Sequence, residues 1–253
     1  FTLLEDPPSG FGKNMNPCID CHARMFERLK GIALSQGFDF IFSGEVLGQR
    51  PMSQNKGSLN RVRNLSETGD ILLRPLSAKL LPPTPMEISG MVDRSRLLDI
   101  SGRGRTSQIS LAEHYGFSLV PAPAGGCLLT DPGYSKRLGV LMEKELLTPE
   151  NASLIRYGRM FTLDGAIGLA GRTRQENAAI RATEHTNLLD IKDVPSPLGV
   201  LLGKRTESNM KLLASIVASF TRTEGPFIAV TARGEFETEK IKLEDREKLR
   251  IVL

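Results

Sequence analysis

An amphipathic helix joined to an apolar strand by a single glycine is the feature that most constrains the fold of this chain. Residues 19–36 carry apolar side chains at helical spacing, and Gly37 follows as a residue type that commonly ends a helix. Residues 38–42 then form an apolar run that predicts a short buried strand. This order is typical of α/β domains, whose ligands bind beyond the carboxyl ends of parallel strands. Residues 43–54 are therefore a candidate site loop.

The remaining sequence continues the alternation of helices and strands. We expect further helices near residues 54–65, 106–114, 135–147, 173–184 and 207–221, and strands near 71–74, 198–202, 227–231 and 249–253. Asp164-Gly165 predicts the turn of a hairpin over residues 161–167. Because the composition changes near Thr148, we expect two domains, residues 1–147 and a smaller α/β domain over 148–253.

The bulk composition is that of an ordinary globular protein. The 253 residues are 40% hydrophobic and 25% charged, which suits one large or two ordinary domains. No apolar run is long enough to cross a membrane, and residues 1–8 lack the features of an export signal. We therefore expect a cytoplasmic protein without a membrane partner.

All three cysteines lie in segments flanked by proline or glycine. Cys18 and Cys21 form a C-x-x-C after Pro17, and Cys127 follows Gly125-Gly126. An odd number of cysteines argues against a disulfide framework and for a reducing compartment. The C-x-x-C stands at the start of the first expected helix, where exposed N–H groups favour thiolate. Three thiolates suit a metal or cluster site with one open position.

The cysteines by themselves leave several chemistries open. A redox disulfide needs only Cys18 and Cys21, whereas structural zinc needs a fourth ligand such as His22 or His114. An iron–sulfur cluster held by three cysteines leaves one iron open, and three buried structural thiols are a further alternative. His22 follows Cys21 directly, which makes joint ligation of one metal awkward. We interpret His22 as a surface residue or a neighbour of the ligands.

Basic residues gather in the middle of the first expected domain. The net charge is +4, and few acids interrupt a band made of Arg50, Lys56, Arg61, Arg63, Arg74, Lys79, Arg94, Arg96, Arg103 and Arg105. Such a band suits phosphate groups, including those of RNA, although a solvated surface with counter-charges is the alternative. Two glycine–lysine segments, at residues 10–13 and 199–204, do not match a phosphate-binding loop, and we interpret them as turns.

The first part of the chain resembles the ATP-dependent tRNA thiouridylases of the PP-loop superfamily. The resemblance rests on N-P-C-x-x-C at residues 16–21, on F-D-F-I-F-S-G-E at 38–45 and on L-R-P-L-S at 73–77. The segment 125–128 occupies the place of the family's distal catalytic cysteine. The match covers about residues 10–141. It departs from the family at the T-G-H turn, which reads Ser43-Gly44-Glu45 in this chain.

The resemblance implies part of an adenine nucleotide hydrolase-like parallel-sheet domain that transfers sulfur to a uridine of tRNA. The uridine is first adenylated with ATP and Mg²⁺, and a sulfur donor protein or sulfide is a further partner. The family's nucleotide turn assigns cofactor contacts to Ser43, Gly44 and Glu45. In its cluster-dependent members three cysteines hold a 4Fe–4S cluster, which implies Cys18, Cys21 and Cys127 as catalytic residues and metal ligands. In the cluster-free scheme Cys127 carries a persulfide and a thiol of the C-x-x-C resolves it.

The family's ATP loop, S-G-G-x-D-S, does not occur in these 253 residues. We therefore expect a longer natural chain whose other part binds most of the ATP and Mg²⁺, and little ATP hydrolysis by these residues alone.

A segment of the second expected domain resembles the RNA-binding domain of the NFACT family. It runs D-G-A-I-G-L-A-G-R-T-R-Q-E-N over residues 164–177, with Thr173 where that family has Asn. The resemblance implies phosphate contacts by Arg172, Arg174 and Arg181 near the start of a helix. With the basic band, the expected RNA-binding residues are Arg50, Arg61, Arg63, Arg74, Lys79, Arg103, Arg105, Arg172 and Arg174.

Two alternatives to a sulfurtransferase remain open at the level of sequence. One is an RNA-binding module with a structural metal, and the other is a different reaction of the same superfamily, such as amidation. The sequence is compatible with a homodimer but does not determine the oligomeric state.

Overall fold

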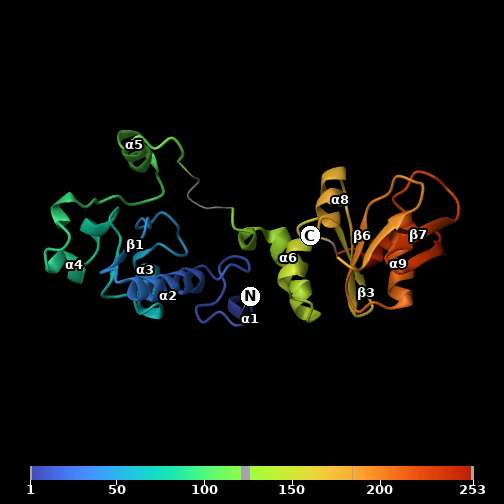
Figure 1. The fold of residues 1–253 in the computed structure, drawn as a ribbon, viewed down its shortest axis with the longest axis horizontal. Helices are drawn as coiled ribbons and strands as arrows, with labels where there is room; N and C mark the ends of the chain where they lie inside the picture. Colours follow the sequence, from blue (N-terminus) through green and yellow to red (C-terminus); the bar gives the residue numbers. More distant parts are fainter. Residues whose placement is uncertain (1, 121–125, 184, 252–253) are drawn as a thin grey trace. The chain divides into compact units, whose positions relative to one another are not determined.

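The computed structural model describes residues 2–120, 126–183 and 185–251, and it divides the chain into two compact units (Figure 1). Unit 1 comprises Phe1–Thr130 and unit 2 comprises Asp131–Leu253. Each unit is considered by itself. None of the helices in the described ranges is both long and apolar enough to span a membrane.

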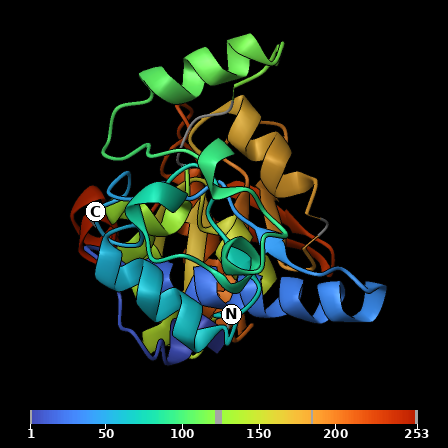
Figure 2. The ribbon, with the colours of Figure 1, turned by 90° about the vertical axis from the view of Figure 1, so that its left-hand side faces the viewer.

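Unit 1 is built around two helices and a short parallel pair of strands. Its elements are α1 (Thr2–Glu5), α2 (Cys18–Gln36), β1 (Ile41–Phe42), α3 (Lys56–Leu65), β2 (Leu72–Leu73), α4 (Pro85–Ile88) and α5 (Thr106–His114). Strand β1 pairs in parallel with β2, and Phe26 of α2, Val62 of α3 and Leu72 of β2 form a small core between them. Helix α5, green in Figure 2, has no buried residue.

Helix α2 confirms the first sequence prediction almost to the residue. It ends where Gly37 adopts a left-handed conformation, with φ of 71°, and the Gly37 N–H caps the helix by bonding to the Ala33 carbonyl. A residue with a side chain would be strained at this angle, which is why glycine stands there.

Unit 2 is a six-stranded antiparallel sheet with helices. Its elements are α6 (Pro132–Glu143), α7 (Pro149–Leu154), β3 (Arg159–Leu163), β4 (Ala166–Ala170), α8 (Arg174–Arg181), β5 (Leu188–Ile191), β6 (Gly199–Gly203), α9 (Glu207–Ala218), β7 (Phe227–Thr231), β8 (Gly234–Thr238) and α10 (Leu243–Leu249). The strand order is β3-β4-β6-β5-β7-β8. The predicted hairpin is confirmed as β3 and β4, with Gly165 at a φ of 59° in the turn.

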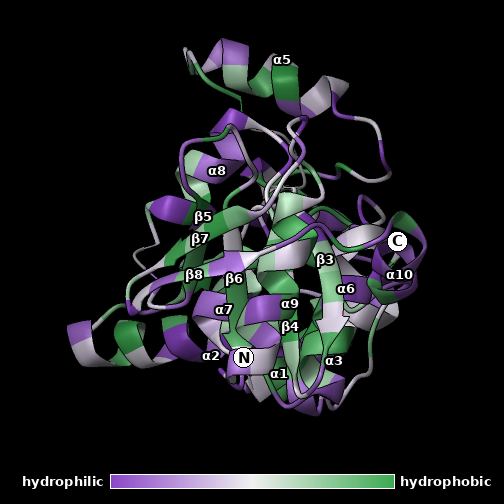
Figure 3. Cartoon of the chain, turned by 90° about the vertical axis from the view of Figure 1, so that its right-hand side faces the viewer, coloured by the Kyte–Doolittle hydropathy of each residue, from purple (hydrophilic) through white to green (hydrophobic). Residues whose placement is uncertain are grey.

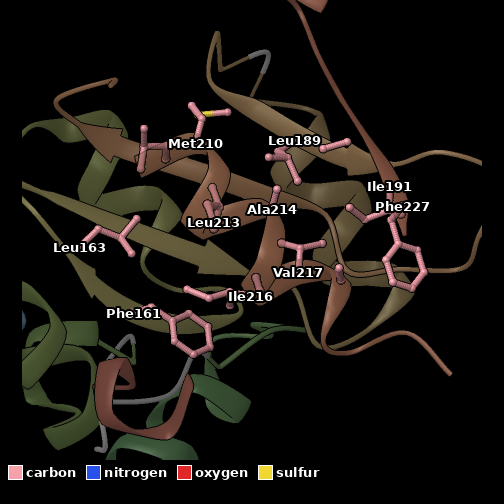
Figure 4. Packing of buried hydrophobic residues seen from close by; sticks show 14 of the residues in the cluster. Phe161, Leu163, Leu189, Ile191, Met210, Leu213, Ala214, Ile216, Val217 and Phe227 are labelled. Carbon is pink, nitrogen blue, oxygen red and sulfur yellow. The ribbon is translucent and has the colours of Figure 1, made fainter. Parts of the chain in front are cut away.

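The core of unit 2 lies between this sheet and α9. Leu213, Ala214 and Val217 of α9 are fully buried and pack with Phe161 and Leu189 from the sheet (Figure 4). Figure 3 shows β4 and β6 largely in the green of hydrophobic residues. These two strands lie inside the sheet and are covered on both faces. Their sequences are therefore continuous apolar runs and do not alternate between apolar and polar residues.

The α/β class is confirmed, but the expectation of a larger parallel-sheet domain is wrong for the described residues. Unit 1 contains only the two-stranded parallel sheet, and every strand pair of unit 2 is antiparallel. The strand expected at residues 38–42 shrinks to two residues because Phe38 and Phe42 lie in solvent. A parallel strand needs neighbours that cover it on both faces, and the other expected strand of this region, β2, is equally short.

Three further differences concern the second half of the chain. The strand expected near residues 249–253 is reduced to an isolated bridge: Leu249 ends α10, Arg250 bridges with Phe161, and residues 252–253 lie outside the described ranges. Strands β5 and β8 were not expected from the sequence.

The expected domain boundary after residue 147 lies within unit 2. Helix α6 belongs to unit 2 because its side chains bond to the segment that follows it. Tyr134 Oη donates to Ala152 O at 2.9 Å, and Arg137 Nη1 donates to Ile155 O at 2.7 Å.

Candidate functional site

The C-x-x-C occupies the first turn of α2 in unit 1. Helix α2 begins at Cys18, so Cys21 lies one turn along, and the Cys21 N–H donates to Pro17 O at 2.8 Å. Pro17 supplies no side-chain cap. Asn16 is buried and its Nδ2 donates to Cys18 Sγ at 3.1 Å, so a side chain just before the helix holds the first thiol.

Gly12 allows the preceding loop to fold against Asn16. The Gly12 N–H donates to Asn16 O at 3.0 Å, and a Cβ added at Gly12 would lie only 2.3 Å from Asn16 Nδ2. The glycine pattern near residue 10, predicted as a turn, thus makes room for the side chain that contacts Cys18.

The segment that carries Cys127 is tied to the loop before Cys18. Thr130 donates to Cys127 O from its backbone N at 3.0 Å and from Oγ1 at 2.6 Å. Thr130 O in turn accepts a hydrogen bond of 2.7 Å from Asn14 Nδ2. Two parts of the chain far apart in sequence are therefore joined beside the C-x-x-C.

The three cysteines interact electrostatically. The pKa of Cys21 is raised from its ordinary value of 9.0 by partial burial, then by the negative charge of Cys127, and then by that of Cys18. The direction is opposite to the one expected from the helix N-terminus, because partial burial disfavours the charged thiolate and the two neighbouring cysteines add to this effect. All three thiols are free, with Cys21 and Cys127 exposed to solvent.

These cysteines do not form a ligand set in the arrangement observed. Among the described residues, no three side chains of His, Cys, Asp or Glu are placed to hold a metal ion. The residues therefore converge without the close geometry that a bound ion or cluster requires.

A buried charged network connects three parts of unit 1: α2, the loop that follows β1, and the end of β2. Glu45 Oε1 lies 2.8 Å from His22 Nδ1, and Glu45 Oε2 accepts a hydrogen bond of 2.8 Å from Arg74 Nε. Glu45 and Arg74 are 6% and 7% exposed. Burial alone would raise the pKa of Glu45, but the hydrogen bond from His22 and the charge and hydrogen bond of Arg74 lower it overall. Glu45 is thus held ionised between two basic groups.

This network changes the interpretation of two residues, Arg74 and His22. Arg74 was expected to contact RNA, yet its guanidinium is buried against Glu45 and Leu59 O, which removes it from the surface. His22 was interpreted as a surface residue or a neighbour of the ligands. It is half-buried, with one ring nitrogen held by Glu45. Sequence reasoning missed this contact because nothing local links the residue after the C-x-x-C with the loop after a strand.

An open cleft of about 490 Å³ lies beyond the carboxyl end of β1. Its apolar wall is formed by Met25, Phe26, Leu29 and Phe42, and its polar lining is formed by His22, Ser43, Gly44, Glu45, Gln49, Arg50, Gln54, Arg105 and Gln108. The expected site loop therefore does line a cleft at the expected end of the strand. Arg50 Nε and Gln54 Oε1 are buried there with no hydrogen-bond partner in the described part of the chain.

The remaining basic residues of the expected band are distributed over unit 1. Arg61 is exposed and donates to Ser9 Oγ and Pro8 O, and exposed Lys79 donates to Ser95 O. Arg63 lines a second cavity of about 280 Å³ together with Lys56. Arg103 is exposed. The band is thus partly committed to local structure and partly free for a partner.

In unit 2, Arg172 and Arg174 flank Thr173, which caps α8. Both side chains are exposed, as expected for residues that contact phosphate. The Arg172 N–H donates to Glu176 Oε2 at 2.7 Å, and Thr173 Oγ1 accepts from Glu176 N at 3.1 Å. Thr173 therefore caps the helix, and the Glu176 carboxylate folds back onto the backbone of the residue before the cap.

No family model matches the chain, and no curated protein matches it. Among solved structures, the chain is similar to the C-terminal part of the fibronectin/fibrinogen-binding protein from Streptococcus suis. The sequence identity is 12%, the alignment covers 92% of this chain and 96% of that chain, and the TM-score is 0.33. A TM-score at this level does not establish a common fold.

Proposed function

We propose that this chain is part of an ATP-dependent tRNA sulfurtransferase that handles sulfur through Cys18, Cys21 and Cys127. The observation that carries the proposal is the convergence of Cys127 with the C-x-x-C, supported by the Asn14–Thr130 hydrogen bond and by the effect of Cys127 on the pKa of Cys21. Free thiols that lie close enough to influence Cys21 suit chemistry in which sulfur passes between them.

The family resemblance and the architecture together give a finer form of the proposal. The parallel pair β1 and β2 would belong to an adenine nucleotide hydrolase-like sheet, and unit 2 would be an RNA-binding domain similar to that of the NFACT family. A reducing cytoplasm would keep the three thiols free. The partners would be tRNA and a sulfur donor protein or sulfide.

The cleft beyond β1 is the proposed nucleotide site. Gly44 has open space around it, so a ligand could approach its backbone closely, and Ser43 lies beside it. The unsatisfied Arg50 Nε and Gln54 Oε1 offer a donor and an acceptor. Glu45 lines the same cleft, but its carboxylate is already bonded to Arg74 and His22, so it would shape the site rather than bind Mg²⁺ directly.

A 4Fe–4S cluster is one form of the sulfur carrier in this proposal. Cys18, Cys21 and Cys127 would be its ligands, and its open iron would bind sulfide. The present arrangement of the described residues does not fit such a group, because the side chains are not placed to hold a metal. The steps below therefore use only the protein's own thiols.

In the cluster-free form, the Cys127 thiolate attacks the terminal sulfur of a persulfide on the donor protein. A new S–S bond forms on Cys127, the S–S bond of the donor breaks, and the donor's thiol leaves. The terminal sulfur attacks the uridine carbon whose oxygen carries AMP, so a C–S bond forms, the C–O bond breaks and AMP leaves. A second thiol then attacks Cys127 Sγ, which releases the thiouridine and leaves a disulfide that a thiol reductant returns to two thiols. Cys21 is the proposed attacking thiol, since Cys127 is the nearby charge that affects it most.

The test is made in cells, because adenylation requires an ATP loop that these residues do not contain. The gene is deleted in the source organism, and tRNA nucleosides are measured by mass spectrometry. We expect loss of one thiouridine, its return with the intact gene, and no return with Cys127→Ser. Return of the thiouridine with Cys127→Ser would refute the three-cysteine proposal, and an unchanged nucleoside profile in the deletion strain would refute tRNA thiolation altogether.

Anaerobic purification distinguishes the two forms of the carrier. About four irons per chain, lost in each Cys→Ser variant, would support the cluster. Absence of iron together with a persulfide on Cys127 would support the thiol form. Zinc without iron, combined with an unchanged nucleoside profile, would favour an RNA-binding module with a structural metal.

A further inference from the structure

Five arginines from separate segments converge in unit 2, outside the cysteine site. They are Arg137 of α6, Arg159 at the start of β3, Arg172 before α8, Arg246 of α10 and Arg250 just after α10. The end of the chain brings the last two close to β3: Arg250 bridges with Phe161, and the Ile251 N–H donates to Met160 O at 2.9 Å.

A single aromatic ring orders two of these guanidinium groups. Arg159 lies 4.6 Å and Arg246 lies 4.3 Å from the centroid of the Phe220 ring. Arg159 also donates to Gly171 O at 3.4 Å, and Arg246 donates to Ser219 Oγ at 3.2 Å. Both guanidinium groups are therefore held in place before any ligand arrives, which lowers the entropy cost of binding.

Arg137 forms the buried base of the cluster. Its guanidinium donates to three backbone carbonyls, those of Ile155, Tyr157 and Gly158, at 2.7–3.1 Å. No carboxylate among the described residues forms an ion pair with it. Burial, followed by the positive charge of Arg172, lowers the pKa of Arg137 to about 10.

The negative charge of the carboxylates near the cluster does not balance the positive charge of its arginines. Glu247 pairs with Arg246 and Arg250, Glu176 accepts bonds from the backbone of Arg172 and Gly158, and Asp131 acts on Arg137 from a distance. Five guanidinium groups thus face three carboxylates. The exposed Arg172 side chain has no hydrogen bond or ion pair within the described residues. Burial and the charges of Arg172, Arg250 and Arg246 also lower the pKa of Arg159.

We propose that this cluster, with Arg159, Arg172 and Arg250 at its surface, binds a backbone phosphate of RNA. The proposal rests on the proposed function, in which the chain binds tRNA, and it names the part of unit 2 that makes contact. Planar guanidinium groups bind phosphate oxygens in pairs, and an excess of positive charge is relieved by a phosphate. Arg159 and Arg246 both lie against the Phe220 ring, so two guanidinium groups already engage that ring. The contact would position RNA rather than read its sequence.

The experiment measures binding of the whole chain to tRNA by filter retention over a series of salt concentrations. Arg172→Ala and Arg250→Ala remove exposed side chains. Arg233→Ala is the matched control, because Arg233 is an exposed arginine of the same unit that lies between β7 and β8 and is not part of the cluster. We expect each cluster variant to bind several-fold more weakly and to lower the slope of log K against log salt by about 1, and the control to change neither.

A second variant tests whether preorganisation matters. Phe220→Leu keeps every charge but removes the ring that both Arg159 and Arg246 contact, so tRNA affinity should fall while the salt slope stays the same. Circular dichroism must first show that each variant is folded.

The outcomes separate this proposal from the proposed function. Cluster variants that bind tRNA as the control does would overturn the phosphate site and leave tRNA binding intact. An unaltered chain that fails to bind tRNA would refute both. Equal loss of binding to tRNA and to heparin in the cluster variants, with no preference for tRNA in the unaltered chain, would make the cluster a general anion site and refute the assignment to RNA.

Discussion

Replacing Glu45 by alanine should destabilise unit 1 more than any exposed charge substitution. Glu45 and Arg74 are each more than nine-tenths buried, and their Oε2 and Nε atoms lie 2.8 Å apart. Without the carboxylate, the Arg74 guanidinium would stay buried with Leu59 O, at 3.2 Å, as its remaining hydrogen-bond partner among the described residues, and His22 Nδ1 would lose the contact with Glu45. Breaking one half of a buried pair costs roughly 3–5 kcal/mol. This is a large share of the roughly 5–15 kcal/mol that stabilises a typical domain.

Two companion variants separate charge from shape. Glu45→Gln keeps the volume and one acceptor, so we expect a loss of about 1.5–3 kcal/mol, the range for a hydrogen bond to a charged group. The double variant Glu45→Leu with Arg74→Met removes both charges together, and we expect it to be more stable than Glu45→Ala. Glu27→Ala is the control in the same unit: its exposed pair with Arg24 is worth less than about 1 kcal/mol.

The assay is hydrogen exchange of peptides from α2 and α3, followed by mass spectrometry at increasing urea concentration. This reports the stability of unit 1 without assuming that both units unfold together. A loss below about 1 kcal/mol in Glu45→Ala, comparable to that of Glu27→Ala, would refute the argument that a buried pair supports this site.

The same carboxylate predicts a dependence on pH. The pKa of Glu45 is lowered in the fold from an ordinary value of 4.5, so its stabilising effect is complete above that pH. The effect is lost as the pH falls through the lower pKa of the folded state, because the folded state must then take up the proton. Unit 1 of the unaltered protein should lose stability over this acidic range, and the Glu45→Gln protein should lose less.

Three further predictions concern the thiols and the backbone. Cys127→Ala removes a negative charge beside Cys21, so the pH midpoint for alkylation of Cys21 should move down; an unchanged midpoint would contradict their interaction. Gly158→Ala should destabilise unit 2 by about 1–3 kcal/mol in urea unfolding, since Gly158 has a φ of 70° and an added Cβ would lie 2.6 Å from Ala170 O. Thr173→Ala removes the cap of α8 and should cost about 1 kcal/mol, seen as faster exchange in that helix alone.

Much of the local structure could be predicted because its causes are local. Gly37 ends α2 and Asp164-Gly165 forms the hairpin turn, each through bonds or backbone angles within a few residues. The strands near residues 40 and 72 were located but overestimated in length. The length of a strand depends on which other segments of the chain cover that strand, and the whole fold determines this.

The candidate site could likewise be predicted only where its features are local in the sequence. The sequence located the cysteines, the loop after β1 and the exposed arginines beside Thr173. It could not show that Arg74 is buried against Glu45, since an arginine in a basic stretch has the same local pattern whether it faces RNA or a carboxylate. Nor could it show that Arg159 and Arg246, whose positions in the chain are far apart, both lie against the Phe220 ring.

By itself, then, the sequence determined the α/β class, most helix limits and the residue types available for sulfur and phosphate chemistry. Only the tertiary structure decided that the sheet of unit 2 is antiparallel, that Cys127 approaches Cys21, and which arginines are committed to buried partners. The physical reason is the range of the interactions. Caps and turns are set by neighbours in the chain, whereas strand pairing, burial and clustering of like charges depend on segments that meet only after folding.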